Sequence, residues 1–328
     1  MKNNFAKNGT KNGIKGTAKN NTKNNTNRNT KNINAQEKSV EFKKLADLFK
    51  FHGIHPDKNL GQNFLWNPEA INKILDAAEA GPRDYVIEIG CGAGALTEGL
   101  CLRAGFVCGV EIDDRILTLL ENRLSIYPNH KIINRDILRT DIVGELMSPE
   151  LLAQAGFDGA PEHVKIVGNL PYYITTAIMT ELMKLHGAVS DITVMMQTEV
   201  ADKITALPGA DGYGPLSIMA KCFAQTERVT EVEGTSFLPE APVQSTVLKF
   251  VMRDEPLVPD EVSAHMFKVT KAAFAQRRKT LQNCMVSAGF CGGDKAAVEA
   301  AIVRAGLEPN IRGEKLSLEQ FARLAEEI

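Results

Sequence analysis

Two features that define other protein classes are missing from this chain of 328 residues. No apolar run approaches the roughly 18 residues that would cross a bilayer, so we expect no membrane association. The six cysteines form no CxxC pair and show no metal-ligand spacing with histidine. That usage is typical of reduced thiols in the core of a cytoplasmic protein, and it predicts no metal site.

Acidic residues are absent from positions 1–36, where seven lysines and Arg28 give a charge of +8. Because the whole chain has a net charge of −2, the remainder carries −10. The first 36 residues are mostly Asn, Lys, Thr and Gly and cannot bury a core, so we expect a disordered tail. It is either a basic arm that attracts a polyanion or a solubilising tail, and any nucleic-acid surface on the acidic body must be a local patch.

The body of the chain predicts two parts. Strand-like apolar runs alternate with helical patterns over residues 37–254, which is typical of an α/β fold with a Rossmann-like sheet. From residue 255 onward the pattern is helical and interrupted by glycines, which predicts a small C-terminal helical domain over 255–328. The helices expected there span 260–275, 277–288, 294–305 and 317–327.

A glycine-rich turn follows the first of these strand-like runs. Residues 85–89 are β-rich, and they lead into Gly90-Cys91-Gly92-Ala93-Gly94 and a helix. Glycines let a ligand approach the backbone closely. The second strand, over 106–110, ends at Glu111, whose carboxylate suits the two hydroxyls of a ribose. This combination predicts an adenosine-type cofactor and leaves open whether it is a nicotinamide dinucleotide or S-adenosylmethionine.

Two further segments each have a structural and a functional interpretation. Asp136 follows the third strand, and it could accept a hydrogen bond from an adenine amino group or cap a turn. Gln62 and Asn63 lie just before a helix that begins at Asn67-Pro68. They could be ordinary capping residues, and the segment alone does not distinguish the alternatives.

The stretch Asn169-Leu170-Pro171-Tyr172 follows a buried strand and is unusually polar for a packing role. Loops at the carboxyl end of a parallel sheet bind ligands in α/β proteins. If a base is flipped out of its stack, the Asn169 side-chain oxygen and the Leu170 carbonyl can accept both hydrogens of its exocyclic amine, and Tyr172 can stack on its ring. Transfer of an activated methyl group to that amine needs orientation, but neither a metal nor a base that acts beforehand.

Phe237 lies in a loop that Pro239 and Pro242 should stiffen. It is either a core residue or the second aromatic wall of the base pocket, and we include it among the candidate catalytic residues.

A basic segment in the helical part contains no acidic residue between positions 268 and 279. We interpret it as a surface that contacts RNA phosphates, although a merely solvated helix face has the same composition. Its basic residues are Lys268, Lys271, Arg277, Arg278 and Lys279.

With these motifs in place, the chain resembles the KsgA family, the bacterial small-subunit ribosomal RNA adenine N6,N6-dimethyltransferases. The similarity covers about residues 37–328. The chain departs from the family pattern at Cys91, at Thr198 and in the tail. The matching stretches are Leu60–Leu65, Glu88–Glu98, Val110–Asp113, Asn169–Ile174, Phe237–Ser245 and Phe274–Leu281.

The resemblance implies a monomeric, S-adenosylmethionine-dependent enzyme that dimethylates two adjacent adenosines near the 3′ end of 16S rRNA, in a hairpin loop of the 30S subunit. The cofactor contacts implied or expected are Asn63, Leu65, Gly90, Gly92, Glu111, Asp136 and Asn169. Four other functions remain as alternatives: a 23S rRNA adenine methyltransferase of the macrolide-resistance type, a DNA adenine methyltransferase, a non-catalytic ribosome assembly factor on the same fold, and a nicotinamide oxidoreductase.

Overall fold

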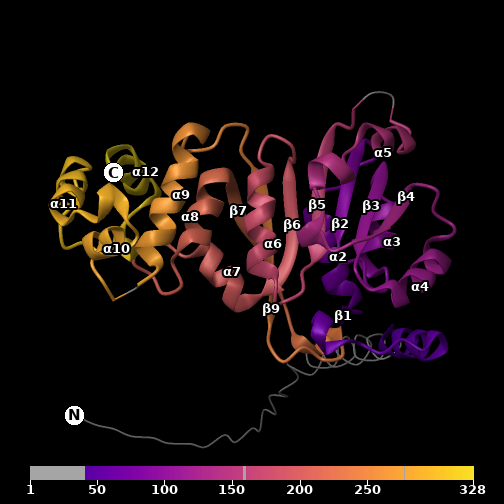
Figure 1. Cartoon of the computed structure of the whole chain (residues 1–328). Helices are drawn as coiled ribbons and strands as arrows, with labels where there is room; N and C mark the ends of the chain where they lie inside the picture. The colour runs from indigo at the N-terminus through magenta and orange to yellow at the C-terminus, as the bar shows by residue number, and fades with distance from the viewer. Residues whose placement is uncertain (1–40, 158–159, 277) are drawn as a thin grey trace, which may run out of the picture.

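The structure, a computed structural model, describes residues 41–157, 160–276 and 278–328 (Figure 1). The expected tail over 1–36 lies outside these residues. A seven-stranded sheet forms the centre of the molecule in the order β4-β3-β2-β5-β6-β9-β7. The first five strands in this order pair in parallel, and β9 is antiparallel to both β6 and β7. The strands are β2 (Asp84–Ile89), β3 (Phe106–Glu111), β4 (His130–Asn134), β5 (His163–Asn169), β6 (Asp191–Gln197), β7 (Ala224–Val232) and β9 (Ser245–Met252).

The central strands are buried on both faces, which explains why their sequences are continuously apolar. In β2, Tyr85 and Ile87 belong to one apolar cluster and Val86 to another, because successive side chains point to opposite faces. Helices α6 (Thr175–Leu182) and α8 (Pro215–Phe223) pack on the first face. Helices α2 (Pro68–Ala78) and α3 (Ala95–Cys101) pack on the second.

The strand order reverses between β2 and β5, since β3 and β4 follow β2 on one side and β5 and β6 extend the other. Ligands of open α/β sheets bind at such a point, beyond the carboxyl ends of the strands. A small antiparallel sheet of β1 (Phe64–Leu65) and β8 (Phe237–Leu238) lies near this edge. The connecting helices are α4 (Asp114–Leu124), α5 (Pro149–Gln154), α7 (Thr198–Thr205) and the π-helix η3 (Ile142–Leu146), and a further helix covers residues 41–52.

Four helices form the C-terminal part, as the sequence predicts: α9 (Asp260–Phe274), α10 (Leu281–Ser287), α11 (Lys295–Arg304) and α12 (Leu318–Glu327). Helix α10 begins four residues later than expected because Thr280 caps it, accepting a hydrogen bond from the Asn283 N–H. Met266 and Phe321 belong to the same apolar cluster as the first face of the sheet, so the helical part packs directly on α8. A domain boundary near residue 255 stays a prediction. None of the described helices is both long and apolar enough to span a bilayer.

Candidate active site

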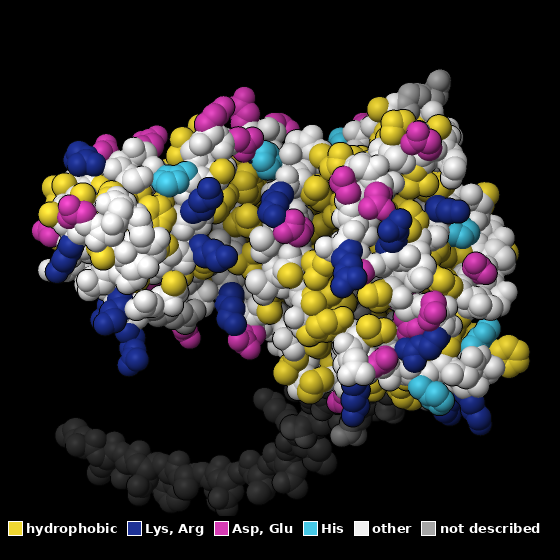
Figure 2. Space-filling view, viewed as in Figure 1, with side chains coloured by type: hydrophobic (Ala, Val, Ile, Leu, Met, Phe, Trp, Pro, Cys, Tyr) yellow, Lys and Arg dark blue, Asp and Glu magenta, His cyan; other side chains and the backbone are white. Residues whose placement is uncertain are grey.

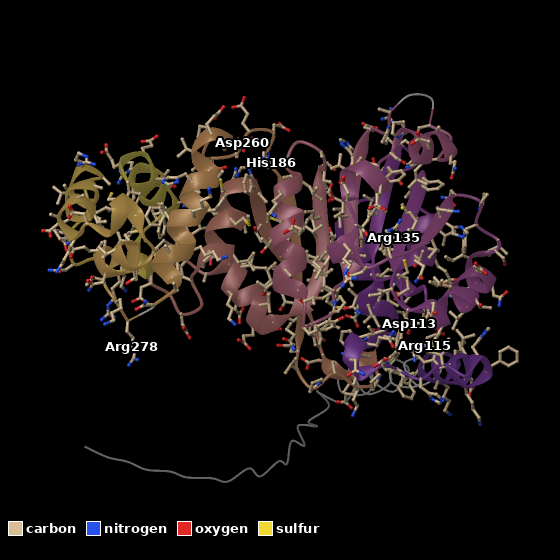
Figure 3. All side chains as sticks on the ribbon, viewed as in Figure 1. Asp113, Arg115, Arg135, His186, Asp260 and Arg278 are labelled. Atoms are coloured by element: carbon tan, nitrogen blue, oxygen red, sulfur yellow. The ribbon has the colours of Figure 1, made fainter. Side chains whose placement is uncertain are left out.

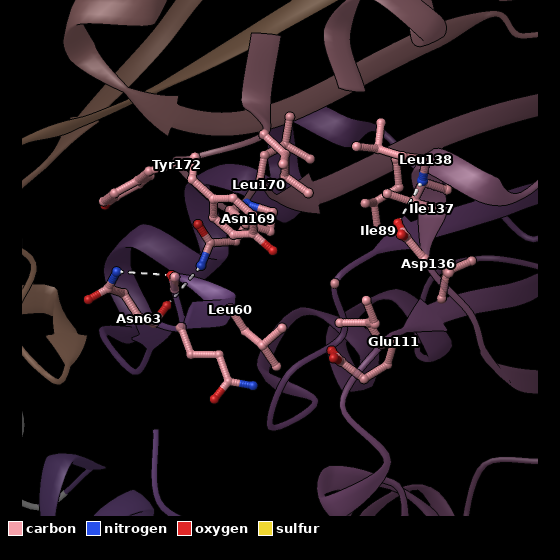
Figure 4. Close-up of a pocket in the computed structure, with 18 of the residues that line it drawn as sticks. Leu60, Asn63, Ile89, Glu111, Asp136, Ile137, Leu138, Asn169, Leu170 and Tyr172 are labelled. Atoms are coloured by element: carbon pink, nitrogen blue, oxygen red, sulfur yellow. Dashed lines mark hydrogen bonds between the residues drawn. The ribbon is translucent and has the colours of Figure 1, made fainter. Parts of the chain in front are cut away.

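A pocket lies at the carboxyl ends of β2, β3 and β5 (Figure 4). It brings together segments that are far apart in the sequence: residues 60–64, the end of β3, the turn after β4 and the loop after β5. In Figure 4, Asn63 and Tyr172 lie on one side of the pocket and Glu111 and Asp136 on the other. Of the site residues expected from the sequence, those that line the pocket are Asn63, Gly90, Glu111, Asp136, Asn169, Leu170, Pro171 and Tyr172.

Two glycines of the turn after β2 have left-handed backbone conformations that other residues rarely adopt. Gly90 has φ +75°, and a Cβ there would lie 3.6 Å from the Asn169 carbonyl oxygen, at the pocket wall. Gly92 has φ +50°, and a Cβ there would lie 3.2 Å from the Phe64 ring. Larger residues would strain both positions. Gly92 does not line the pocket itself, but its N–H donates to Glu111 Oε2 at 2.8 Å.

Glu111 is held in place by two backbone groups. Besides Gly92, the Asp113 N–H donates to Glu111 Oε1 at 2.9 Å. Burial raises the pKa of Glu111 above its ordinary value, while these backbone hydrogen bonds oppose the shift. Each carboxylate oxygen can accept a further hydrogen bond, so the open side of Glu111 fits a pair of ribose hydroxyls. The residues present therefore fit an adenosine-type cofactor.

Asp136 combines the two roles that the sequence leaves open. Its Oδ1 accepts the Leu138 N–H at 3.0 Å and so caps the short helix η2 (Ile137–Arg139). The same residue lines the pocket. A capping oxygen retains acceptor capacity, so a contact with an adenine amino group is compatible with the cap.

Asn169 is the last residue of β5, and its side chain is oriented by another segment. Its Nδ2 donates to the Asn63 carbonyl at 3.1 Å. The Leu170 N–H donates to the Met195 carbonyl at 3.0 Å, which ties the turn to β6. Because Nδ2 has this partner, Oδ1 is left as the acceptor that Asn169 can offer to a ligand.

The ring of Tyr172 is anchored at its far end. Its hydroxyl and the Ser245 hydroxyl are 2.7 Å apart, within hydrogen-bonding distance. Ser245 is fully buried at the start of β9, so the anchor is rigid. The stretch over 237–245 thus contributes to the site through Ser245, a residue the sequence analysis did not single out.

Phe237 does not line the pocket, which corrects the expectation that it forms a second wall. Its side chain is 1% exposed and packs in the apolar cluster that contains Val232 and Val247. It pairs with Leu65 between β8 and β1, and Leu65 is likewise buried rather than part of the pocket lining. The pairing turns both side chains into one apolar cluster, while the lining residue Phe64 belongs to another.

Three polar residues that sequence reasoning did not assign to the site are connected to it. Gln62 Nε2 donates to Asp113 Oδ2 at 2.7 Å, and Arg115 makes two hydrogen bonds to the Asp113 carboxylate. The position of Asp113 before α4 indicates a helix cap, and its side chain does cap α4. Its contact with Gln62 joins positions 51 residues apart, and no local sequence pattern indicates such a contact.

A fourth unassigned residue, Glu88, lies buried in β2 beneath the glycine turn. Burial raises its pKa to about 7, and the charge of Glu111 adds to the shift. Its Oε2 has no hydrogen-bond partner within the part of the chain that the structure describes.

The basic segment lies far from the pocket, in the helical part. Lys268 and Lys271 lie on α9, and Arg278 and Lys279 lie in the connection to α10 rather than in a helix. All four are exposed and take part in no ion pair among the described residues. Arg277 lies outside those residues. Lys and Arg side chains project from the lower left of Figure 2, the end where Figure 3 labels Arg278.

The family model described as ribosomal RNA adenine dimethylase matches residues 55–328. The chain belongs to this family. The "Ribosomal RNA small subunit methyltransferase A" of Shouchella clausii is 42% identical over 86% of the chain and 92% of its own length. The protein of the same name from Enterococcus faecalis is 40% identical over 87% of the chain and 97% of its own length. These matches confirm the family resemblance and the methyltransferase class of enzyme.

Solved structures confirm the Rossmann-like fold of this rRNA adenine dimethylase. A dimethyladenosine transferase from Plasmodium falciparum has a TM-score of 0.63 at 23% identity and covers 80% of the chain and 95% of its own. The 23S rRNA methyltransferase ErmE has a TM-score of 0.59 at 28% identity, with 81% and 99% covered.

We predict that Phe237→Leu weakens the fold of the dimethylase and spares its catalysis. A slightly smaller side chain in a tight core should cost about 1 kcal/mol of unfolding free energy, measured in urea. The kcat for methyl transfer should stay within a few-fold of wild type because the ring does not face the pocket. A large fall in kcat at unchanged stability would instead favour the second-wall role.

We predict that Glu88 makes the stability of the dimethylase depend on pH. Unfolding returns the carboxyl to its ordinary pKa of about 4.5, so between that pH and about 7 the folded state binds the extra proton. The stabilisation is therefore complete below pH 4.5 and is lost as the pH rises to 7. Relative to Glu88→Gln, the wild type should lose on the order of 1–3 kcal/mol between pH 5 and 8, measured by urea unfolding. Parallel pH profiles for the two proteins would contradict this.

Proposed function

We propose that this chain transfers methyl groups from S-adenosylmethionine to the N6 amines of two adjacent adenosines in the 3′-terminal hairpin loop of 16S rRNA. Family membership and the curated relatives support this reading. The observation that carries it is the orientation of Asn169, whose amide is held at 3.1 Å by the Asn63 carbonyl in the pocket that Gly90 and Glu111 also line. A nicotinamide oxidoreductase would have no use for this arrangement.

The proposed methyl transfer depends on hydrogen bonds that the exocyclic amine donates to Asn169 Oδ1 and to the Leu170 carbonyl. An exocyclic amine is a poor nucleophile because its lone pair is conjugated with the ring. Asn169 Oδ1 and the Leu170 carbonyl can each accept one N–H, which favours a pyramidal nitrogen with its lone pair directed at the methyl donor. Tyr172, anchored by Ser245, can stack on the base, a contact worth roughly 1–3 kcal/mol.

Bound in the pocket, S-adenosylmethionine supplies a methyl carbon on a positively charged sulfur. Attack by N6 on that carbon would break the carbon–sulfur bond, and sulfur would keep the electron pair. The nitrogen loses its extra proton afterwards, so Asn169 contributes orientation rather than basicity. The second transfer to each adenosine requires that the pocket also accept a monomethylated amine.

The cofactor would be held mainly by three groups. Glu111 suits the ribose, Asp136 suits the adenine amino group, and the Gly90 backbone leaves space for the remainder. Asn63 would cover the cofactor, while Leu65 and Gly92 support the site from behind the lining residues.

The RNA-binding surface that we propose extends from the pocket to the helical part. The exposed cations suited to phosphate contacts there are Lys268, Lys271, Arg278 and Lys279. Arg277 belongs to the same set by its place in the sequence and lies outside the described residues. Such contacts position an RNA without reading its bases. We further propose that the protein acts as a monomer on the 30S subunit in the cytoplasm.

The deciding experiment measures label transfer from radioactive S-adenosylmethionine to 30S subunits that lack this modification, followed by mapping of the modified bases. We expect dimethylation of two adjacent adenosines in the 3′-terminal hairpin loop of 16S rRNA. Isolated 50S subunits and 23S rRNA serve as competing substrates. Label on 23S rRNA would favour the macrolide-resistance type, and the absence of label from every RNA would contradict an RNA methyltransferase.

We predict that Asn169→Ala abolishes transfer without abolishing binding. Loss of one preorganised hydrogen-bonding group should lower kcat by roughly 100-fold or more. The dissociation constant of S-adenosylhomocysteine, measured by calorimetry, should change only a few-fold.

The control for Asn169→Ala is Asn122→Ala, an exposed position on α4 that should be neutral. Binding of 30S subunits by the Asn169→Ala protein would separate an assembly role from catalysis. Near-normal turnover would contradict the orienting role of Asn169.

A further inference from the structure

The segment 57–65, here termed the lid segment, forms one side of the pocket. It contains the short helix η1 (Lys58–Leu60), a left-handed turn at Gly61 and strand β1. Leu60 to Phe64 line the pocket directly. The pairing of β1 with β8 fixes the end of the lid segment, and the position of the residues before β1 depends on the side chains that hold them.

Gln62 makes one hydrogen bond within the lid segment and one to the residue that caps α4. Its Oε1 accepts the Asp57 N–H at 2.8 Å, and its Nε2 donates to Asp113 Oδ2 at 2.7 Å. Arg115 donates to Asp113 from Nε and Nη2, at 2.7 Å in each case. Figure 3 shows Asp113 and Arg115 together at the lower right, next to the lid segment. The Asp113 carboxylate is therefore held between an amide and a guanidinium.

This cluster reaches the reacting site by two routes. The backbone N–H of Asp113 donates to Glu111, the expected ribose contact, at 2.9 Å. The carbonyl of Asn63, next to Gln62, accepts from Asn169 Nδ2 at 3.1 Å. A shift of the lid segment would consequently release the amide on which the proposed chemistry depends.

We propose that Gln62, Asp113 and Arg115 form a latch that holds the lid segment over the cofactor and, through the Asn63 carbonyl, sets the orientation of the Asn169 amide. These three are positioning residues, since none of them needs to touch the reacting atoms. The inference rests on the proposed methyl transfer for its effect on turnover, but the latch itself can be tested without it.

The charge of Asp113 determines that Nε2 of Gln62, and not Oε1, faces the carboxylate. Hydrogen bonds from Arg115, opposed by burial, hold the pKa of Asp113 below its ordinary value, so this group stays an ionised acceptor. An amide can accept from the Asp57 N–H with its oxygen and donate to a carboxylate with its nitrogen, whereas an ionised carboxylate can only accept. A glutamate at position 62 keeps the first contact and replaces the second by repulsion. Gln62→Glu therefore opens the latch at one end with almost no change in shape.

The test compares Gln62→Glu with wild type and with Gln225→Glu, a matched change at an exposed position of β7. Loss of a hydrogen bond to a charged group should weaken S-adenosylhomocysteine binding by about tenfold or more and lower kcat by a similar factor. Backbone amides of residues 61–64 should exchange with solvent faster, while the thermal midpoint stays near that of the control. Arg115→Lys should fall between wild type and Arg115→Ala.

The link to Asn169 has its own readout, the NMR signals of its side-chain amide, assigned by their loss in Asn169→Ala. We expect these signals to shift and broaden in Gln62→Glu, whether or not the RNA substrate has been identified correctly. Unchanged lid exchange and unchanged cofactor affinity would overturn the latch. Weaker cofactor binding with unchanged kcat and unchanged Asn169 signals would overturn its connection to the catalytic amide.

Discussion

The site depends on a single hydrogen bond between two segments that are 106 residues apart, from Asn169 Nδ2 to the Asn63 carbonyl. It orients the Asn169 amide, and it does so with a backbone atom of the segment that forms one side of the pocket. The orientation of the amine acceptor and the closure of the cofactor site are therefore one structural condition. Either of them alone would leave the methyl donor or its acceptor misplaced.

The remaining polar contacts support this condition from outside the pocket. Gly92 and Asp113 hold Glu111 through backbone N–H groups, and Ser245 holds the Tyr172 ring. Glu111 and Tyr172 thus each have at least one hydrogen-bond partner that takes no part in the proposed reaction. Preorganisation of this kind lets a protein speed a transfer to which it contributes no acid, no base and no covalent bond.

The sequence predicted the parts of the site that are encoded locally. Strand, glycine turn and helix in succession place Gly90 and Glu111 at one sheet edge, and a polar stretch after a buried strand identifies Asn169. It failed where the decisive contact is distant. The pairing of Leu65 with Phe237 joins strands 172 positions apart. It buries the Phe237 ring, which from the loop sequence alone could equally face a ligand. The helix expected from residue 277 begins at Leu281, because Thr280 caps it.

The packing of the helical part on the sheet has a consequence for substrate choice. Because one apolar cluster runs from β2 and β5 through α8 and α9 to α12, the position of α9 relative to the pocket cannot change without disrupting the core. On the proposed function, an RNA must then present a phosphate to Lys268 or Lys271 of α9 and a flipped adenine to Asn169 at one separation. This fixed separation would favour a folded RNA of the correct dimensions over a flexible strand of the same sequence.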